Sequence, residues 1–437
     1  MFRPTGFADL AGKRVGILGF GVEGHATRER IADLASSLVI VDDASGRGPE
    51  VIVSSEGGLD ALRTCDVVLK SPGIPRRRFD VLELERSGVC VTSALNLWLH
   101  DTERERVVAV TGTKGKSTTT SLIAFFLDCV GESALALGNL GQPPYDPTLD
   151  TAEGWLVLEV SSFQCVDIDI APSNVVVTSL GSDHLDWHGS LDIYRSDKLS
   201  LTRAAGKHVT WVNDTALFHE LDDAGELGGE LRFVRADTSE LTESLGLLGA
   251  HSHTNVALAL AVVSSLSGHD PEDLRARIID SAPNFEPLKG RLTLVARETN
   301  NDATIRFVDD GLATTALPTI AALAVFASDA VALIVGGLDR GVDYAELAEV
   351  IREREAPTAV IAMGAAGRRL AGELRGNDTV VEVFVVESMF EAVYRARTFL
   401  QGDGVVLLSP AAPSFDHYEN WLERSEDFER CIEATRD

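Results

Sequence analysis

The chain has 437 residues, of which 45% are hydrophobic and 24% charged, and its formal net charge at pH 7 is −28. This length predicts about three domains of about 150 residues each. The acidic balance argues against a general nucleic-acid binder, because such a surface repels phosphate backbones. The five cysteines are scattered without a C-x-x-C spacing, which indicates free thiols rather than a zinc site or a disulfide framework.

Two features bear on membranes and secretion. The chain lacks a basic segment followed by an apolar one at its start, so we expect no secretory signal. The most apolar window, residues 317–337, contains Asp329 and ends in two glycines. It predicts a helix, a turn and a buried strand rather than a membrane span.

Short apolar runs alternate with helical segments in the first hundred residues, at 14–20, 37–43 and 65–75. This alternation predicts a parallel sheet with helices on its faces. The charged segment 100–107 is typical of a turn, and we place the end of a first domain, residues 1–103, within it.

The turn G-F-G-V-E-G at 19–24 follows the first apolar run, and Asp42 ends the next run about twenty residues later. This arrangement is similar to a dinucleotide-binding turn. A plain strand-to-helix turn is the open alternative, and Glu23 inside the turn would repel a pyrophosphate.

The stretch T-G-T-K-G-K-S at 111–117 lies between an apolar run and a helical segment. It matches G-x-x-G-K-S, although Val110 stands where the full phosphate-loop pattern has glycine. The N–H groups of such a turn and of the following helix point at an anion. Lys116 would then reach the β- and γ-phosphates, and Ser117 or Thr118 would contact Mg²⁺. The stretch predicts a nucleoside triphosphate site; a glycine turn with a solvated lysine is the alternative.

The rest of the chain continues the alternation. Apolar runs follow at 154–162, 174–180 and 207–214, with a helical segment at 252–266. The polar segment 296–302 is expected to be structureless and to separate a second domain, residues 104–300, from a third, residues 301–437. The third domain contains apolar runs at 304–310, 330–337, 357–364, 379–386 and 404–410.

Several stretches together resemble the Mur ligases, and within them the type that adds D-glutamate. They are L-E-V-S-S-F-Q (158–164), S-D-H-L-D-W-H-G-S-L-D-I-Y-R-S-D-K (182–198), G-A-H-S-H-T-N (249–255), G-G-L-D-R-G-V-D-Y (336–344) and the segment 407–428. The resemblance implies three α/β domains: a Rossmann-like N-terminal UDP-sugar-binding domain, a central P-loop ATPase domain and a Rossmann-like C-terminal amino-acid-binding domain.

The resemblance also implies an activity. The enzyme would be an ATP-dependent acid–amino-acid ligase (ADP-forming) of cytoplasmic peptidoglycan precursor synthesis, and we expect a monomer without membrane insertion. Its substrates would be UDP-N-acetylmuramoyl-L-alanine and glutamate. ATP would phosphorylate the carboxyl group, the amine of glutamate would attack the acyl phosphate, and phosphate would leave.

The resemblance assigns ATP, Mg²⁺ and catalysis to particular positions. The residues implied at the ATP are Gly112, Thr113, Lys114, Gly115, Lys116, Ser117, Thr118, Asn255 (adenine), Arg291 (γ-phosphate) and Asp310 (ribose). Two Mg²⁺ ions are implied, with Ser117, Glu159, His184 and a carbamylated Lys198 as ligands, and the implied catalytic set is Lys116, Glu159, His184 and Lys198. Solvated or packing roles are the alternatives at each of these positions.

Substrate contacts follow from the same resemblance. The UDP-sugar pocket would include Gly19, Gly21, Asp42, Ser71, Pro72, Gly73 and Asn139. The glutamate site would include Thr314, Arg340, Ser414, Phe415 and Trp421, with the Arg340 guanidinium binding the side-chain carboxylate.

The match is incomplete at some positions. Leu312 replaces a lysine of the family pattern, and Phe415 and Trp421 stand where smaller or different apolar residues are usual. Ser252 replaces an asparagine, and Lys289-Gly290 replaces Pro-His before Arg291. The departures near the acceptor leave open L-glutamate in place of D-glutamate.

Two other classes remain as alternatives. A folylpolyglutamate-type ligase would share the central block but would not need a UDP-sugar domain. A non-catalytic nucleotide-binding regulator would not need Glu159, His184 and Lys198 together.

Overall fold

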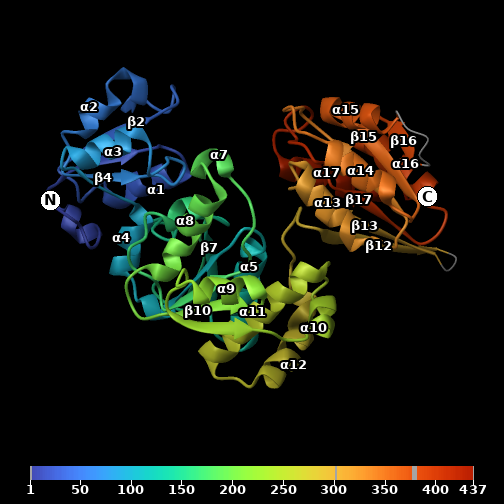
Figure 1. Ribbon diagram of the computed structural model, residues 1–437, viewed down its shortest axis with the longest axis horizontal. Helices are drawn as coiled ribbons and strands as arrows, with labels where there is room; N and C mark the ends of the chain where they lie inside the picture. The colour runs from blue at the N-terminus through green and yellow to red at the C-terminus, as the bar shows by residue number, and fades with distance from the viewer. Residues whose placement is uncertain (1, 301–302, 376–380, 437) are drawn as a thin grey trace. The chain divides into compact units, whose positions relative to one another are not determined.

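The computed structural model describes residues 2–300, 303–375 and 381–436, apart from the side chains of Leu185, Asp186 and Asn300. It divides into two compact units (Figure 1). The first unit comprises Met1–Thr238 and Thr254–Ser281, and the second comprises Ser239–His253 and Ala282–Asp437. The first unit contains two β-sheets and the second contains one.

The first sheet has the strand order β3-β2-β1-β4-β5, and all its neighbouring strands are parallel. Its strands are β1 (Arg14–Leu18), β2 (Ser37–Asp42), β3 (Val51–Val53), β4 (Val67–Lys70) and β5 (Cys90–Thr92). The helices of this region are η1 (Phe7–Leu10), α1 (Val22–Ile31), η2 (Ser54–Glu56), α2 (Gly58–Leu62), α3 (Phe79–Arg86), α4 (Ala94–Asp101) and η3 (Arg104–Arg106).

The second sheet is also parallel and has the order β11-β10-β9-β6-β8-β7. Its strands are β6 (Val107–Thr111), β7 (Ala134–Gly138), β8 (Trp155–Glu159), β9 (Asn174–Val177), β10 (Val209–Asn213) and β11 (Glu230–Val234). The helices are α5 (Lys116–Cys129), α6 (Ser162–Cys165), α7 (Leu185–His188), α8 (Leu191–Arg203), α9 (Ala216–Asp223), α11 (Ala250–Ser267) and α12 (Pro271–Ser281).

The third sheet has the order β12-β13-β17-β14-β15-β16, with β12 antiparallel to β13 and the other neighbours parallel. Its strands are β12 (Thr293–Asn300), β13 (Ala303–Asp309), β14 (Val331–Gly336), β15 (Thr358–Met363), β16 (Glu382–Val385) and β17 (Gly404–Leu408). The helices of the second unit are α10 (Ser239–Ser244), η4 (Ala282–Asn284), α13 (Ala316–Val325), α14 (Ala345–Glu353), α15 (Gly364–Leu374), α16 (Met389–Phe399) and α17 (Trp421–Ala434).

Alternate residues of the strands enter different cores, as a sheet with helices on both faces requires. In the third sheet, Leu333 and Val335 pack with helices α13, α14 and α15, whereas Ile334 packs with α16 and α17. One core of the first unit contains Ile17 of the first sheet together with Ala109 of the second. These two sheets are therefore joined by continuous apolar packing.

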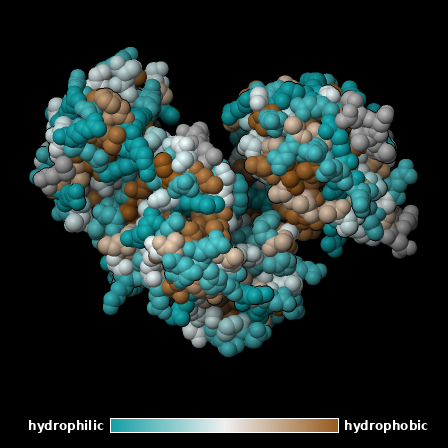
Figure 2. Space-filling model, viewed as in Figure 1, coloured by the Kyte–Doolittle hydropathy of each residue, from teal (hydrophilic) through white to brown (hydrophobic). Residues whose placement is uncertain are grey.

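The predicted α/β fold with three sheets of mainly parallel strands is confirmed, and so is the helix, turn and strand in 317–337. No helix among the described residues is long and apolar enough to cross a membrane. Figure 2 shows hydrophilic residues over most of the visible surface, in keeping with the acidic composition.

The expectation that 296–302 is structureless is wrong for residues 296–300, which belong to β12; residues 301 and 302 lie outside the described residues. The polar pattern suits an edge strand, because Glu298 is paired with Arg397 of α16 and with Arg436. Both strands of the hairpin β12–β13 lie in the third sheet, so a boundary at 300/301 would separate paired strands. The predicted run at 379–386 forms β16 from Glu382, and its first two residues are also outside the described part.

In an open parallel sheet, ligands bind at the carboxyl ends of the strands, at the point where the strand order reverses. In the first sheet this point lies between β1 and β4, and in the second it lies at β6, between β8 and β9. Gly19 and Gly21 follow β1, Ser71 follows β4, and the predicted phosphate loop follows β6.

Candidate active site

At two positions of the loop after β6, the backbone has a conformation that only glycine adopts without strain. Gly112 has φ +142° and Gly115 has φ +87°. A Cβ atom on Gly112 would lie 2.1 Å from the Thr178 hydroxyl oxygen, and one on Gly115 would lie 2.4 Å from Oδ1 of Asn255. The predicted strand, turn and helix are all present, since α5 begins at Lys116.

Two lysine side chains converge on one carbonyl oxygen of this loop. Nζ of Lys116 donates to the oxygen of Gly112 at 3.0 Å, and Nζ of Lys198, from α8, donates to the same oxygen at 2.8 Å. Lys198 is only 2% exposed, and burial together with the charge of Lys116 lowers its pKa to about 7. An anion beside the two ammonium groups would relieve their repulsion, which is what a phosphate site requires.

The loop is tied to the segment after β9 by its own polar groups. The Thr178 hydroxyl donates to the oxygen of Lys114 at 2.6 Å, and the Thr113 hydroxyl lies 2.9 Å from the Tyr194 hydroxyl. Ser117 is buried in the first turn of α5, next to Thr118. These bonds hold the loop in one conformation.

Glu159 ends β8 and has one carboxylate oxygen without a protein partner. Oε1 accepts a hydrogen bond from Nδ2 of Asn139 at 3.0 Å. Oε2 is buried and makes no hydrogen bond within the described part of the chain. An unmatched buried oxygen costs about 1–3 kcal/mol, and a cation would satisfy it. This observation fits a metal ligand, although the described residues contain no group of three or more His, Cys, Asp or Glu suited to a metal.

His184 and Asp183 follow β9. His184 has φ +50°, its side chain is half-exposed, and its ring centroid lies 4.9 Å from that of Phe163. Burial opposes ionisation of Asp183, but Lys114, at 3.2 Å, and His184 outweigh it and lower the pKa of this carboxyl. The segment after β9 therefore places an anionic and a basic side chain at the carboxyl edge.

An unpredicted network lies directly beside Lys198. Arg77 donates two hydrogen bonds of 2.7 Å to the carboxylate of Asp197, which also lies 2.8 Å from Nδ1 of His188. Nε2 of His188 lies 3.0 Å from the Ser162 hydroxyl, and burial lowers the pKa of His188. The network joins the first sheet's region to α8; its members are separated by up to 120 positions in the chain, so no local motif reveals it.

Asn255, on α11, lies next to the loop. Its Oδ1 is the atom nearest to a Cβ placed on Gly115, and its Nδ2 is buried without a hydrogen-bond partner among the described residues. The predicted adenine contact is therefore close to the phosphate loop and has an unused donor.

In the first sheet, the predicted pocket residues hold the glycine turn together. The Ser71 hydroxyl donates to the oxygen of Gly19 at 2.7 Å, and the Asp42 carboxylate accepts the N–H of Phe20 at 2.6 Å. A Cβ on Gly21 or on Gly73 would meet no atom within 4 Å, so the surface beside them is open. Pro72 stands between Ser71 and Gly73.

Glu23 does not point toward a ligand of this turn. Its carboxylate accepts hydrogen bonds from the Tyr145 hydroxyl at 2.9 Å and from Nε2 of Gln164 at 2.7 Å. Burial raises its pKa. The Glu23 carboxylate is hydrogen-bonded to Tyr145 and Gln164, so the expectation that it would repel a pyrophosphate at the glycine turn is weakened.

The second unit carries the remaining predicted ATP contacts. The Asp310 carboxylate follows β13 and accepts a hydrogen bond from the Ser409 hydroxyl at 2.7 Å. Burial raises its pKa to about 7. Arg291 is exposed, next to Leu292.

The predicted acceptor residues Thr314, Arg340, Ser414 and Phe415 lie on loops at the carboxyl edge of the third sheet, and Trp421 is the first residue of α17. The Arg340 guanidinium lies 5.7 Å from the ring centroid of Phe415, which is exposed. Thr314 is exposed, Ser414 is buried, and the Trp421 ring lies 2.8 Å from the position of a Cβ on Gly290. The structure thus brings Arg340 and Phe415 together.

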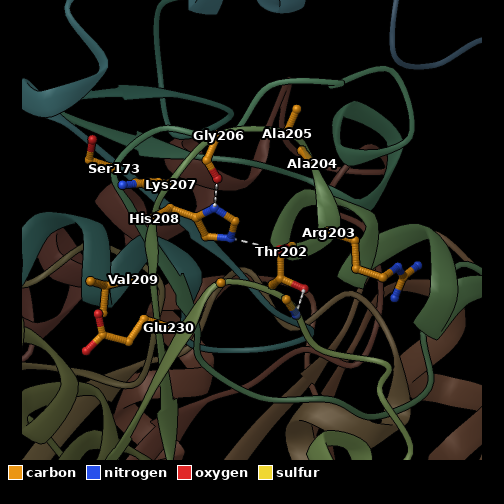
Figure 3. A pocket seen from close by; sticks show the side chains of 12 residues that line it. Ser173, Thr202, Arg203, Ala204, Ala205, Gly206, Lys207, His208, Val209 and Glu230 are labelled. Atoms are coloured by element: carbon orange, nitrogen blue, oxygen red, sulfur yellow. Dashed lines mark hydrogen bonds between the residues drawn. The ribbon is translucent and has the colours of Figure 1, made fainter.

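A cavity of about 760 Å³ lies at the opposite, amino edge of the second sheet (Figure 3). Both ring nitrogens of His208 face carbonyl oxygens there, that of Gly206 at 3.0 Å and that of Thr202 at 2.8 Å. Ligands of open α/β sheets bind at the carboxyl edge, so we do not include this cavity in the candidate site.

Comparison with known proteins assigns the chain to a family. Residues 110–227 match the family described as Mur ligase middle domain. The chain is 38% identical to UDP-N-acetylmuramoyl-L-alanine--L-glutamate ligase of Micromonospora sp. (98% of each chain) and 36% identical to the protein of that name from Salinispora tropica (98% of this chain, 99% of that one).

Solved structures agree on the fold. The UDP-N-acetylmuramate-alanine ligase MurC of Thermotoga maritima matches with a TM-score of 0.53 at 18% identity, over 97% of this chain and 100% of that one. The MurF ligase of the same organism, solved with ADP, matches with a TM-score of 0.53 at 15% identity, over 99% and 98%. The chain therefore belongs to the Mur ligase family and is an ATP-dependent ligase.

Proposed function

We propose that this ligase joins L-glutamate to UDP-N-acetylmuramoyl-L-alanine with the conversion of ATP to ADP and phosphate. The observation that carries the chemistry is the pair of ammonium groups on the Gly112 oxygen beside the partly unsatisfied carboxylate of Glu159. The names of the relatives at 38% and 36% identity support the two substrates.

A carboxylate is a poor acyl donor, so the reaction needs a better leaving group. In the proposed sequence the γ-phosphoryl group of ATP is transferred to the alanine carboxylate, the amine of glutamate attacks the acyl phosphate, and phosphate leaves. Bound Mg²⁺ would neutralise charge on the phosphates. Lys116, the first residue of α5, would hold the transferring phosphoryl group.

Ser117, Glu159 and His184 are the proposed ligands of the divalent cations. Lys198 is proposed to become carbamylated and to add a carboxylate to that set. Carbamylation requires a neutral amine, and burial with the nearby Lys116 lowers the pKa of Lys198 to about 7. This physical state supports the proposal.

The remaining assignments keep their predicted roles. Asn255, Asp310 and Arg291 are proposed to bind ATP together with the loop residues. The proposed UDP-sugar contacts are Gly19, Gly21, Asp42, Ser71, Pro72, Gly73 and Asn139.

The proposed acceptor site contains Thr314, Arg340, Ser414, Phe415 and Trp421. The relatives' names favour L-glutamate over the D-glutamate that the resemblance implied. The aromatic Phe415 beside Arg340 and the apolar Leu312 support an acceptor pocket of altered shape.

The test is phosphate release from ATP with UDP-N-acetylmuramoyl-L-alanine and each glutamate enantiomer, with a tetrahydrofolate substrate in a parallel assay. We expect product with L-glutamate, and hydroxylamine should trap the activated carboxyl as a hydroxamate when glutamate is omitted. Exclusive use of D-glutamate would overturn the stereochemical proposal. Turnover of the folate substrate alone, or ATP binding without turnover of any substrate, would overturn the function.

A further inference from the structure

Arg424, on α17, is a buried arginine bonded to backbone carbonyls. It is 3% exposed. Its Nη1 donates to the oxygen of Gly336 at 3.3 Å and to that of Ala412 at 3.1 Å, and its Nη2 donates to the oxygen of Gly311 at 3.0 Å. Within the described residues, no carboxylate oxygen lies within 4.0 Å of its side-chain nitrogens. The guanidinium is therefore bonded to loops rather than to an acid.

The three carbonyls belong to three segments at the carboxyl edge of the third sheet. Gly311 follows β13, Gly336 ends β14, and Ala412 follows β17. Because these strands are separated in the chain, one planar side chain sets the spacing of segments that local sequence does not connect. The fork of N–H donors in a guanidinium suits this role, since it reaches several acceptors in fixed directions.

These same segments carry the proposed acceptor residues. Thr314 follows Gly311, Arg340 follows Gly336, and Ser414 and Phe415 follow Ala412. The contact between Arg340 and Phe415 joins the second segment to the third. A change in the spacing of the segments would therefore alter the pocket directly.

The surrounding backbone leaves room for the guanidinium. Gly337 has φ +147°, and a Cβ at this position would lie 2.1 Å from the oxygen of Pro413 and 3.2 Å from Nη1 of Arg424. Burial lowers the pKa of Arg424 to about 10, which keeps it charged at neutral pH. The loops that follow β14 and β17 therefore pack closely around the charged Arg424 guanidinium.

Arg354 makes a similar arrangement at the other edge of the same sheet. It donates to the oxygens of Leu323 at 3.0 Å, Phe326 at 2.9 Å and Asp329 at 2.9 Å. These residues precede β14, so Arg354 lies at the amino edge, away from the acceptor residues. Replacing it should disturb the unit without disturbing the acceptor segments.

We propose that Arg424 is a positioning residue for the amino-acid acceptor site, holding the segments that carry Thr314, Arg340 and Ser414 in register. The proposal rests on the proposed function, because it takes those residues as contacts of the acceptor. Arg424 acts through the backbone and does not touch the reacting atoms.

The test compares Arg424→Gln and Arg424→Lys with Arg354→Gln in the full-length protein. We expect Arg424→Gln to raise the KM for L-glutamate at least tenfold and to leave the KM for UDP-N-acetylmuramoyl-L-alanine within twofold. Arg424→Lys, which keeps one charged donor group, should show a smaller increase. Arg354→Gln should leave both KM values within twofold.

Amide hydrogen exchange measures positioning without catalysis. Arg424→Gln should speed exchange in residues 310–314, 336–342 and 411–415, whereas Arg354→Gln should speed it in residues 323–331. Unchanged exchange in the first three segments, or an equal rise in the glutamate KM for Arg354→Gln, would overturn the proposal. If the unmodified protein does not use glutamate, the proposed function fails, and the exchange experiment still decides whether Arg424 holds the three segments. If Arg424→Gln does not fold, the same two measurements on Arg424→Lys decide the question.

Discussion

The carboxyl edges of the second and third sheets both hold cationic side chains, and the two sets differ in what surrounds them. Lys116 and Lys198 both donate to the oxygen of Gly112, Lys116 also donates to that of Thr113 at 3.3 Å, and the two ammonium groups repel each other. Arg424 donates to three separate oxygens and keeps its charge at neutral pH. The two lysines share an acceptor and repel each other, whereas the Nη atoms of Arg424 each have backbone acceptors and its Nε lacks a hydrogen-bond partner among the described residues.

This difference indicates an anion-binding role for the two lysines and a loop-stabilising role for Arg424. A cation that lies beside a like charge lowers the stability of the free protein, as at other functional sites that trade stability for activity. A bound anion would make its interactions favourable. A cation bonded to several carbonyls stabilises the loops themselves.

Lys116→Met is expected to lower the rate of ADP formation by about 10²–10³-fold, because it removes a fixed cation from the transferring phosphoryl group. The measurement is steady-state turnover with saturating substrates. Lys207→Met, at an exposed lysine beside the cavity of the amino edge, serves as the control and should keep full activity. Full activity of Lys116→Met would remove the basis of the proposed function.

Lys198→Met is expected to abolish turnover and to raise the free energy of unfolding at pH 7 by roughly 1–4 kcal/mol. The Gly112 oxygen would still accept a hydrogen bond from Lys116. Because the pKa of Lys198 is lowered to about 7, the unfolded chain binds this proton between about pH 7 and 10.5 and the folded chain does not. The stability of the unmodified protein therefore rises with pH in this window, and the advantage of the variant should shrink from pH 6 to pH 10.

Urea unfolding in buffer free of carbon dioxide measures this effect. Lys70→Met is the control, since Nζ of Lys70 lies 2.6 Å from Oδ2 of Asp167 and both side chains are fully buried. Breaking that pair leaves the buried Asp167 carboxylate with Arg76, 3.2 Å away, as its remaining charged partner and should destabilise the protein by up to roughly 3–5 kcal/mol. Equal destabilisation by both substitutions would mean that Lys198 is an ordinary structural cation.

The phosphate loop and the α/β class could both be predicted from the sequence, because each depends on a local pattern. The phosphate loop is contiguous, and glycine, lysine and serine are required there by backbone conformation and charge, so residues 111–117 reveal it. The buried parallel strands read as apolar runs because both faces are covered. The alternation of these runs with helical segments was sufficient to predict the α/β class.

Other features depend on contacts that no local pattern contains. Arg77, Asp197 and His188 meet only in the folded chain, and the carbonyl partners of Arg424 come from three separate segments. Strand β12 is polar because it lies at a sheet edge and its charges are paired by α16 and the C-terminal segment. The short strands β3 and β5, of three residues each, are too brief to give a periodic signal.

Gly115→Ala is expected to weaken ATP binding by about 5–10-fold, because the new Cβ would displace Asn255, whose Oδ1 lies 2.4 Å from the Cβ position. The loss of one hydrogen bond to the nucleotide costs about 1–1.5 kcal/mol. Gly131→Ala is the matched control, because Gly131 follows the end of the same helix with φ +83° and has open space around its Cβ position. Calorimetric titration with a non-hydrolysable ATP analogue measures the affinity. Both variants should lose similar stability, whereas binding should weaken only for Gly115→Ala; equal affinities would argue against Asn255 as a nucleotide contact.

Phe415→Ala tests the contact between Arg340 and Phe415 in the proposed acceptor site. The Arg340 guanidinium lies 5.7 Å from the Phe415 ring centroid at an exposed position, and such contacts contribute about 0.5–1 kcal/mol. The KM for L-glutamate should therefore rise about 2–5-fold, with kcat for the reaction little changed, because the ring orients a binding group rather than a reacting one. Phe390→Ala, at an exposed phenylalanine of α16, should leave the KM unchanged. A larger rise than that of Arg424→Gln would show that the aromatic ring, and not the buried arginine, determines where Arg340 lies.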